Sequence, residues 1–253
     1  MSGLERDQSP VPEFRPSLKG RLVFLSASFP SAERHPRYYE TADADELTQA
    51  IVSLARATFA VDGRLLFGGH PSVSPLIMMI AEEYLPVDPD QRGEIVQSRG
   101  FPVVMYQSAA FDSWISEATR RMQNLGLGEI KRTPIAANEM LIDTSEFDPT
   151  QYPESLRLMR DEMIATPDLA GAVYIGGMEG IEKEAQLFRE IHSDLPTYFA
   201  GAPGGAAREI LETSIRHARE SSGNDLPWLE EQLTAREYPA LMQRIVADMA
   251  QRL

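Results

Sequence analysis

The sequence predicts an α/β fold, a three-layer α/β/α sandwich around a mainly parallel sheet of about six strands. Short apolar runs alternate along the chain with longer segments whose apolar residues recur every three or four positions, which is the pattern of repeated βα units. The chain has 253 residues, of which 43% are apolar and 25% charged, so it can bury a sizeable core. We expect a single domain over residues 20–253, with its last helices included, behind a polar leader at 1–19.

The expected strands are short runs rich in Val, Leu, Ile, Phe and Tyr. In chain order they lie at 21–26, 64–67, 102–106, 139–142, 171–175 and 197–200. Helical periodicity follows at 44–60, 75–84, 111–124, 154–165, 181–191 and 206–220, and two more helices are expected near 228–233 and 239–251. Asp43 and Ser74 are the expected N-caps of the first two helices, with Pro75 in a first helical position. The stretch 220–225 is expected to be a connector.

The charge balance restricts the partners. Thirty-eight acidic and 24 basic residues give a net charge of −14, which repels a polyanion, so we expect no duplex nucleic acid as a partner. A small anionic ligand is compatible with this charge, because backbone amides at a helix start act at short range and salt screens charges beyond roughly 10 Å.

The residue inventory argues against several kinds of site. Without cysteine the chain has no disulfide, no thiolate zinc site and no cysteine nucleophile. The four histidines show no paired metal spacing and no G-x-S-x-G motif occurs, so we expect no metal site, no cofactor and no serine hydrolase. No apolar run is long enough for a signal peptide or a membrane span, and we expect a cytoplasmic protein with no membrane partner.

Three strand-to-helix loops carry the functional signal, because ligands of parallel sheets bind outside the carboxyl ends of the strands. The first loop contains Gly68, Gly69, His70, Ser72 and Ser74. Its glycines allow a ligand to approach the backbone closely, and its serine hydroxyls could contact phosphate or ribose. The alternative is a plain glycine turn followed by a serine cap.

The second loop consists of Gly176, Gly177, Met178, Glu179 and Gly180, so three of its five residues are glycines. It is neither a Walker P-loop nor a GxGxxG fingerprint, but it also places unobstructed amides at the positive end of a helix dipole. Glu184 lies one turn into the helix and could face the same cavity. The alternative is that the glycines only turn the strand into the helix and that Glu184 is a solvated acid.

The third loop, 201–207, contains Gly204 and Gly205. Three such loops on one edge of a sheet indicate a ligand-binding hollow more strongly than one. Ser26 and Ser28 at the end of the first strand and Gln107 after the third add polar groups at the same edge. Each serine also has an ordinary turn-forming role.

These loops make the chain resemble the SLOG superfamily, Rossmann-like domains related to the LOG phosphoribohydrolases once labelled lysine decarboxylases. The resemblance covers roughly residues 21–220 and rests on LSASFP at 25–30, GGHPSVSP at 68–75, YIGGMEGIEKE at 174–184 and PGGAA at 203–207. It is nearest to the sensor branch found with prokaryotic conflict systems.

LOG enzymes release a base from a nucleoside 5′-monophosphate. The resemblance implies that Gly180 and Glu184 match the last glycine and the glutamate of their motif, and that Arg160 stands at the place of an upstream arginine. As catalytic residues, Glu184 would stabilise an oxocarbenium-like ribosyl centre and Arg160 would hold the phosphate or position the leaving group.

The chain departs from the enzyme pattern at several positions. Ile175, Ile181 and Asp161 replace a proline, a threonine and a lysine, and Glu179 makes the loop one residue longer. A phosphate pocket that loses a hydroxyl and a cation binds phosphate differently. These departures favour binding over catalysis.

The resemblance therefore implies a sensor domain that binds a nucleotide-derived small molecule, of the ADP-ribose or cyclic nucleotide type, in prokaryotic antiphage or stress signalling. The alternatives are a LOG-type N-glycosidase and a protein that keeps only the fold for interaction. We also expect a homo-oligomer, because the late helices and 11 methionines offer adaptable apolar surface, and an effector protein as partner.

Overall fold

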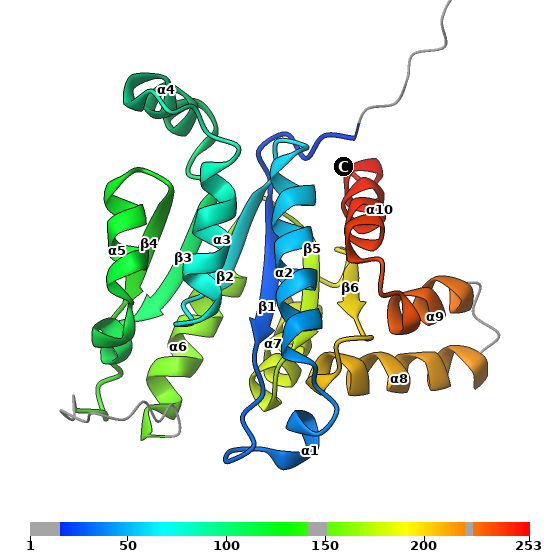
Figure 1. The fold of residues 1–253 in the computed structure, drawn as a ribbon. Coiled ribbons are helices and arrows are strands. Elements are labelled where there is room, and N and C mark those ends of the chain that lie inside the picture. The colour runs from blue at the N-terminus through cyan, green and yellow to red at the C-terminus, as the bar shows by residue number, and fades with distance from the viewer. Residues whose placement is uncertain (1–15, 141–150, 221–224) are drawn as a thin grey trace, which may run out of the picture.

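The computed structural model describes residues 16–140, 151–220 and 225–253. Within these ranges six strands form one all-parallel sheet in the order β4-β3-β2-β1-β5-β6, which confirms the predicted α/β class (Figure 1). The strands are β1 (Leu22–Ser28), β2 (Arg64–Gly68), β3 (Val103–Ser108), β4 (Gly128–Thr133), β5 (Leu169–Gly176) and β6 (Thr197–Ala200). The chain adds strands first on one side of β1 and then on the other, so the order reverses between β1 and β5. Doubly wound folds bind ligands in the crevice at such a reversal.

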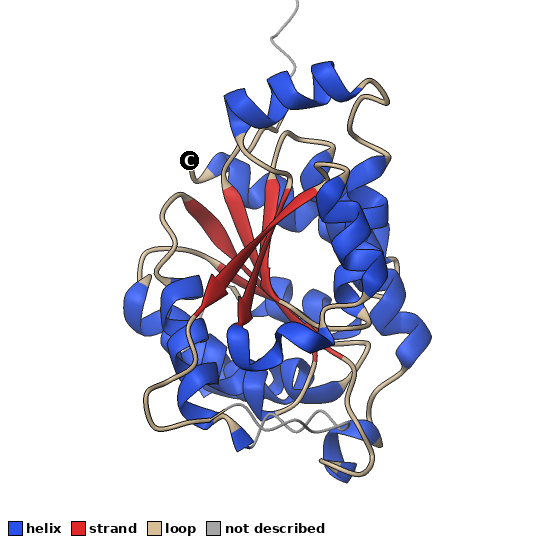
Figure 2. Cartoon of the chain, turned by 90° about the vertical axis from the view of Figure 1, so that its left-hand side faces the viewer, coloured by secondary structure: helices blue, strands red, loops and turns tan. Residues whose placement is uncertain are grey.

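Helices cover both faces of the sheet, as Figure 2 shows. The first face packs under α2 (Ala44–Phe59), α3 (Val73–Glu82) and α10 (Tyr238–Gln251), and the second under α6 (Pro153–Ile164), α7 (Glu179–Ile191) and α8 (Gly205–Glu220). Val23 and Leu25 of β1 point into the first core, whereas Phe24 between them points into the second. This alternation is the strand period of two, and it divides the interior into two hydrophobic cores.

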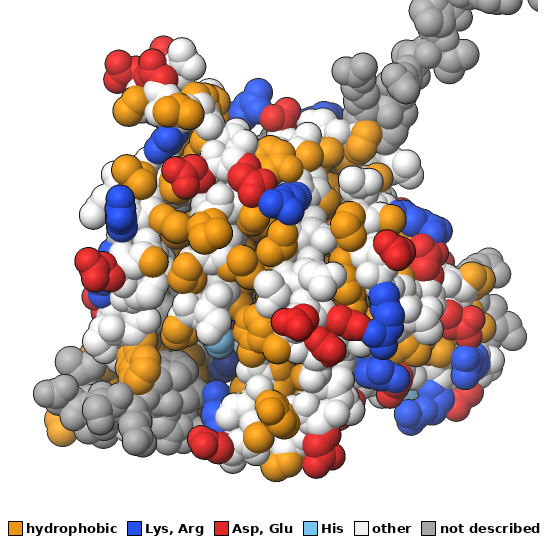
Figure 3. Space-filling view, in the orientation of Figure 1, with side chains coloured by type: hydrophobic (Ala, Val, Ile, Leu, Met, Phe, Trp, Pro, Cys, Tyr) orange, Lys and Arg blue, Asp and Glu red, His pale blue; other side chains and the backbone are white. Residues whose placement is uncertain are grey.

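The other helices are α1 (Pro36–Tyr39), α4 (Pro89–Arg99), the 3-10 helix η1 (Ala109–Trp114), α5 (Glu117–Asn124) and α9 (Leu226–Thr234). None of the described helices combines the length and apolarity needed to cross a bilayer. On the face drawn in Figure 3, lysine and arginine side chains lie scattered among acidic ones.

The two predicted N-caps have different outcomes. The carboxylate of Asp43 accepts hydrogen bonds from the amides of Asp45 and Glu46, both at 3.0 Å, so the cap of α2 is confirmed. The cap predicted for α3 is wrong, because α3 begins at Val73 and Ser74 therefore lies inside the helix. The Ser74 hydroxyl instead accepts a hydrogen bond from the amide of His70 at 3.0 Å, and this bond folds the preceding loop back onto the helix.

The prediction of a fourth strand at 139–142 is also wrong. Positions 139 and 140 are loop, 141 and 142 lie outside the described residues, and the fourth strand is β4 at the edge of the sheet. Edge strands carry charged side chains that discourage pairing with other chains. Lys131 and Arg132 of β4 have this character, and they leave the strand without the apolar run that the sequence analysis sought.

Glu139 has a different task in the structure. Its carboxylate accepts hydrogen bonds from the amides of Glu154 at 2.7 Å and Ser155 at 2.9 Å, at the start of α6. These bonds satisfy two amides that have no acceptor within the helix. Desolvation is the largest single influence on the pKa of the Glu139 carboxyl and raises it, but the hydrogen bonds together outweigh it, so the pKa is lowered.

The helix predicted at 111–124 is two elements, η1 and α5, separated by Ile115 and Ser116. Ser116 begins the second element, because its hydroxyl accepts a hydrogen bond from the Thr119 amide at 3.1 Å. Two short helices, α1 and α4, were not predicted. No residue of α4 is buried, so the helix lacks an apolar stripe and only its Asp88-Pro89 start signals it.

The predicted leader and connector fall partly outside the described residues, at 1–15 and 221–224. Of the leader, only 16–19 is described. Leu18 within it is fully buried in the first core, and its amide donates to the carbonyl of Val61 at 2.9 Å.

Candidate functional site

A polar cavity of about 160 Å³ lies at the carboxyl ends of β1, β2 and β5, at the reversal of strand order. Residues of β1 and of the loops after β1, β2 and β5 surround it, together with side chains of α6 and the start of α7. The polar and glycine residues among them are Ser26, Ser28, Arg34, Gly68, Gly69, His70, Arg160, Gly180 and Glu184. We call this space the polar cavity.

Three side chains predicted for the site meet in the wall of the polar cavity. One carboxylate oxygen of Glu184 accepts a hydrogen bond from the Ser26 hydroxyl at 2.6 Å, and the other accepts one from Nε of Arg160 at 3.0 Å. The side chains of Arg160 and Glu184 are only 18% and 14% exposed. A carboxylate with these two donors is held in one position and its charge is balanced, so the group is a rigid acceptor at the edge of the cavity.

The loop after β5 reaches the cavity with part of its length only. Gly176 and Gly177 adopt φ of +64° and +73°, which turn the chain sharply, and neither lines the cavity. Met178 and Gly180 do line it, at the start of α7. The amide of Ile181, in the first turn, is not free, because it donates to the Met178 carbonyl at 2.9 Å. A Cβ on Gly180 would lie 3.2 Å from the Arg160 guanidinium, so the absence of a side chain there leaves room for that cation.

Glu179, which was predicted for the site, does not line the cavity. Its carboxylate lies 2.5 Å from Nε2 of His35, in the loop between β1 and α1. The next acid of α7, Glu182, accepts a hydrogen bond from the Tyr38 hydroxyl at 2.7 Å. Desolvation and this hydrogen bond raise the pKa of Tyr38 to about 12. The two acids therefore fasten the β1–α1 connection to α7 beside the cavity.

Arg34 of this connection is a site residue that the sequence analysis missed. Its side chain lines the polar cavity, and no carboxylate of the described residues lies within ion-pair distance of it. Its charge also contributes to the low pKa of His70, on the same cavity. The signal in the sequence is its place shortly after the first strand, in a loop that contains no glycine.

His70 is held neutral at the rim of the polar cavity. Burial, and to a lesser extent the charge of Arg34, lower its pKa to about 4. The amide of Ser72 donates to its Nδ1 at 3.3 Å, so Nε2 carries the proton and is a hydrogen-bond donor. Ser72 is exposed and does not line the polar cavity.

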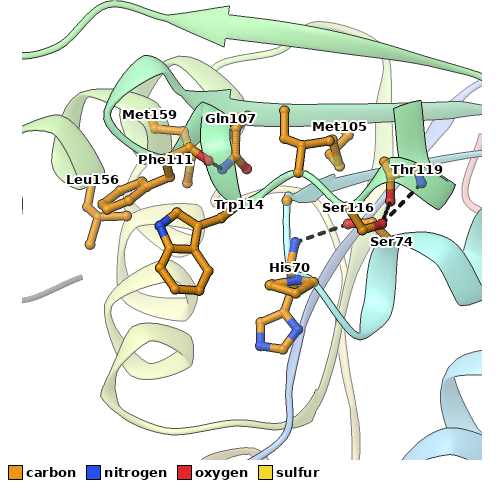
Figure 4. Close-up of a pocket in the computed structure, with 13 residues that line it drawn as sticks. His70, Ser74, Met105, Gln107, Phe111, Trp114, Ser116, Thr119, Leu156 and Met159 are labelled. Atoms are coloured by element: carbon orange, nitrogen blue, oxygen red, sulfur yellow. Dashed lines mark hydrogen bonds between the residues drawn. The ribbon is translucent and has the colours of Figure 1, made fainter. Parts of the chain in front are cut away.

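A second, smaller space of about 40 Å³ lies beside the first, and we call it the apolar chamber (Figure 4). Its walls are largely hydrophobic, with polar groups at a few points. The chamber shares Gly69, His70, Leu156 and Met159 with the polar cavity. Met105, Gln107, Phe111, Trp114, Ile115 and Ser116 belong to the chamber alone. The two spaces are therefore neighbours, with His70 between them.

The third glycine loop does not reach either space. Gly204 and Gly205 are buried, with φ of +86° and +72°. The Gly204 amide donates to the carbonyl of Gly201 at 3.0 Å, and the Gly205 amide to the Thr41 hydroxyl at 3.1 Å. These amides are occupied within the protein, so the structure brings two of the three predicted loops to the cavity and not the third.

Within the described residues, no three His, Asp or Glu side chains are grouped in a way that could hold a metal ion. The comparisons with known proteins give one match. A family model, the SLOG cluster3 family, matches residues 37–232, which is more than half of the chain. No curated protein and no solved structure matches this chain.

Proposed function

Since the chain belongs to the SLOG cluster3 family, we propose that it is a sensor-type domain that binds a nucleotide-derived small molecule in the polar cavity. The ligand class is that of ADP-ribose and cyclic nucleotides, and the setting is antiphage or stress signalling in a prokaryote. The setting rests on the resemblance to the sensor branch of the superfamily. Binding of an effector protein and self-association remain predictions.

One observation carries the proposal. Arg34 lines the cavity and has no acidic partner in the described part of a chain whose net charge is −14. A guanidinium in this position matches phosphate, which it can contact through two parallel N–H bonds. Met178 and Gly180 bring the start of α7 to the same cavity, and a helix N-terminus also favours an anion.

The other polar groups suit the sugar of a nucleotide. The Glu184 carboxylate, fixed by Ser26 and Arg160, can accept further hydrogen bonds from ribose hydroxyls. His70 offers a donor at Nε2 beside it. Acceptors for hydroxyls and cationic groups for phosphate are therefore both within one cavity.

Isothermal titration calorimetry with AMP, ADP-ribose, a cyclic ADP-ribose isomer and a cyclic dinucleotide tests the proposal. We expect at least one of them to bind, and Arg34→Gln to weaken that binding about tenfold or more, because a charge-assisted hydrogen bond contributes about 1.5–3 kcal/mol. Arg216→Gln, on the exposed surface of α8, is the matched control and should leave binding unchanged. Absence of binding for all four ligands would overturn the proposal.

A LOG-type N-glycosidase is the second candidate, and the observation that favours it is the 3.0 Å contact of Arg160 with Glu184 in the cavity wall. Such an enzyme would convert AMP and water to adenine and ribose 5-phosphate. Chromatography of long incubations with AMP separates the candidates, because a binding domain leaves AMP intact. Activity that survives in both Glu184→Ala and Arg160→Ala would reject these catalytic roles.

A further inference from the structure

We propose that the apolar chamber is a subsite for a planar ring that bears an amino group, and that Gln107 recognises this group through its Oε1. The proposal rests on the proposed function, because the ring is taken to belong to a ligand whose sugar and phosphate occupy the polar cavity. It adds a second binding subsite and a chemical selectivity.

The orientation of the Gln107 amide is determined by its surroundings. The side chain is 5% exposed, and its Nε2 donates to the carbonyl oxygen of Phe111 at 2.8 Å. A carbonyl oxygen can only accept, so the NH2 group must face Phe111 and Oε1 must face the other way. Gly69 provides the space for this oxygen, because a Cβ at that position would overlap Oε1.

The hydroxyl groups of the chamber already have partners within the protein, as the dashed lines of Figure 4 show. The Ser74 hydroxyl accepts a bond from the His70 amide, and the Ser116 hydroxyl lies 2.9 Å from that of Thr119. Oε1 of Gln107, in contrast, has no hydrogen-bond donor among the residues that the structure describes. An acceptor that is free at the wall of a largely apolar space can bind a ligand group that donates a hydrogen bond at this point.

The walls of the chamber suit a flat ring. Phe111 and Trp114 offer aromatic surfaces, and Met105 and Met159 are flexible side chains that adapt to the shape of a ligand. The space of about 40 Å³ must widen to admit a whole ring, and rotation of the methionine side chains is the simplest way to achieve this. Because the chamber shares Gly69 and His70 with the polar cavity, a ring placed here connects directly to a ribose placed there.

Oε1 of Gln107 can only accept a hydrogen bond, so it discriminates between rings that present a donor and rings that present an acceptor. The exocyclic amine of adenine or cytosine, or the carboxamide of nicotinamide, donates to Oε1. The keto oxygen of hypoxanthine in the same position would face another acceptor, which is unfavourable in an apolar site. The chamber should therefore prefer an adenine nucleotide to the hypoxanthine nucleotide that differs from it only at this group.

Calorimetry with two matched pairs tests this preference: AMP against IMP, and ADP-ribose against its hypoxanthine analogue. We expect the amino member of each pair to bind the wild-type protein about tenfold more tightly or better. Gln107→Met removes the acceptor and keeps the length of the side chain, so the preference should fall to within about twofold. Gln97→Met, on the exposed surface of α4, is the control and should keep the wild-type preference.

The wild-type comparison decides the matter even if Gln107→Met fails to fold. Purine riboside 5′-monophosphate, which has neither the amine nor the keto oxygen, should bind more weakly than AMP. Equal binding within the pairs, or a preference for the hypoxanthine member, would overturn the role of Gln107 and leave the proposed function intact. Absence of binding for every nucleotide, the cyclic dinucleotide included, would overturn both.

Discussion

The loops at 176–180 and 201–205 resemble each other in sequence, since each places a glycine pair between a strand and a helix, but only one opens onto a cavity. In the first loop, Met178 and Gly180 line the polar cavity. In the second loop, Gly204 and Gly205 are buried and their amides donate to groups of the protein itself.

The difference comes from what lies over each loop. Thr41 and Ala42, between α1 and α2, press on the second loop so closely that a Cβ on Gly204 would overlap the Thr41 carbonyl. In the first loop the glycine pair is covered as well, since a Cβ on Gly176 would overlap Leu47. Only Gly180, further along this loop, is open, because a Cβ there would meet the Arg160 guanidinium alone. A glycine turn after a strand is therefore a binding site only where no other part of the chain covers it, and this cannot be judged from the glycines alone.

The largest effect is expected at the covered loop. Gly204→Ala forces an alanine into φ of +86° and against the Thr41 carbonyl, so it should lower the free energy of unfolding by about 3 kcal/mol or more in urea titrations. Gly93→Ala is the control: it lies within α4 with nothing within 4 Å of the new Cβ, and should stabilise by about 0.5–1 kcal/mol. If Gly204→Ala were as stable as the wild type, the loop would not be closed as described.

The next effect concerns the burial of His70 beside the polar cavity. The pKa of His70 is about 4 in the folded protein, against roughly 6.5 when unfolded. Below pH 6.5 the unfolded chain therefore binds a proton that the folded chain does not. The contribution of His70 to stability is fully present above about pH 6.5 and decreases by up to about 3 kcal/mol as the pH falls to about 4.

His70→Asn tests this pH dependence. The advantage of the wild type over the variant in the free energy of unfolding should shrink between pH 7.5 and 4.5. Parallel pH profiles for the two proteins would mean that water reaches the ring freely, and the open loop would then face a wet groove instead of a shielded cavity.

A smaller effect on stability is expected for the Arg160–Glu184 pair in the wall of the polar cavity. Arg160→Met leaves the partly buried carboxylate of Glu184 with Ser26 as its remaining side-chain donor among the described residues, and should lower the free energy of unfolding by about 1–2 kcal/mol. Adding Glu184→Gln should recover part of this loss, which a double-mutant cycle would measure as a coupling. Arg157→Met, which breaks only exposed pairs on the same helix, should change stability by less than about 0.5 kcal/mol. A coupling of zero between Arg160 and Glu184 would contradict the geometry.

The smallest effect on stability is expected at Gly180. Its φ is not positive and an added Cβ meets only the end of a flexible arginine, at 3.2 Å, so Gly180→Ala should change the free energy of unfolding by less than about 0.5 kcal/mol. The same methyl group displaces the Arg160 guanidinium beside the cavity, so AMP or ADP-ribose binding should weaken severalfold in calorimetry. If Gly180→Ala bound the nucleotide as tightly as the wild type, Gly180 would not be part of the binding site. Gly204→Ala should show the reverse pattern, with large loss of stability and little change in affinity.

The sequence predicted the features that depend on local pattern. Alternating apolar runs located five of the six strands, and the position of loops after parallel strands placed Ser26 and Glu184 at one edge. The resemblance to LOG enzymes added Arg160, and the structure brings the three side chains into contact. The inference for Ser26 and Glu184 succeeds because strand direction alone brings the loops together.

The features that were missed depend on tertiary context. β4 is an edge strand whose charged residues hide its period, and α4 buries no side chain. Arg34 became a candidate only when its lack of an acidic partner in the described chain could be seen beside the cavity. Gly204 looked open because nothing in its own segment reveals the Thr41 carbonyl that covers it.

Amide chemical shifts of the isotopically labelled protein during a titration with ADP-ribose test the central claim most directly. The account predicts that the amides of Gly69, Met178 and Gly180 move with the ligand, while those of Gly204 and Gly205 keep their positions. Movement of the second group as large as that of the first, or no movement at Met178 and Gly180, would contradict it.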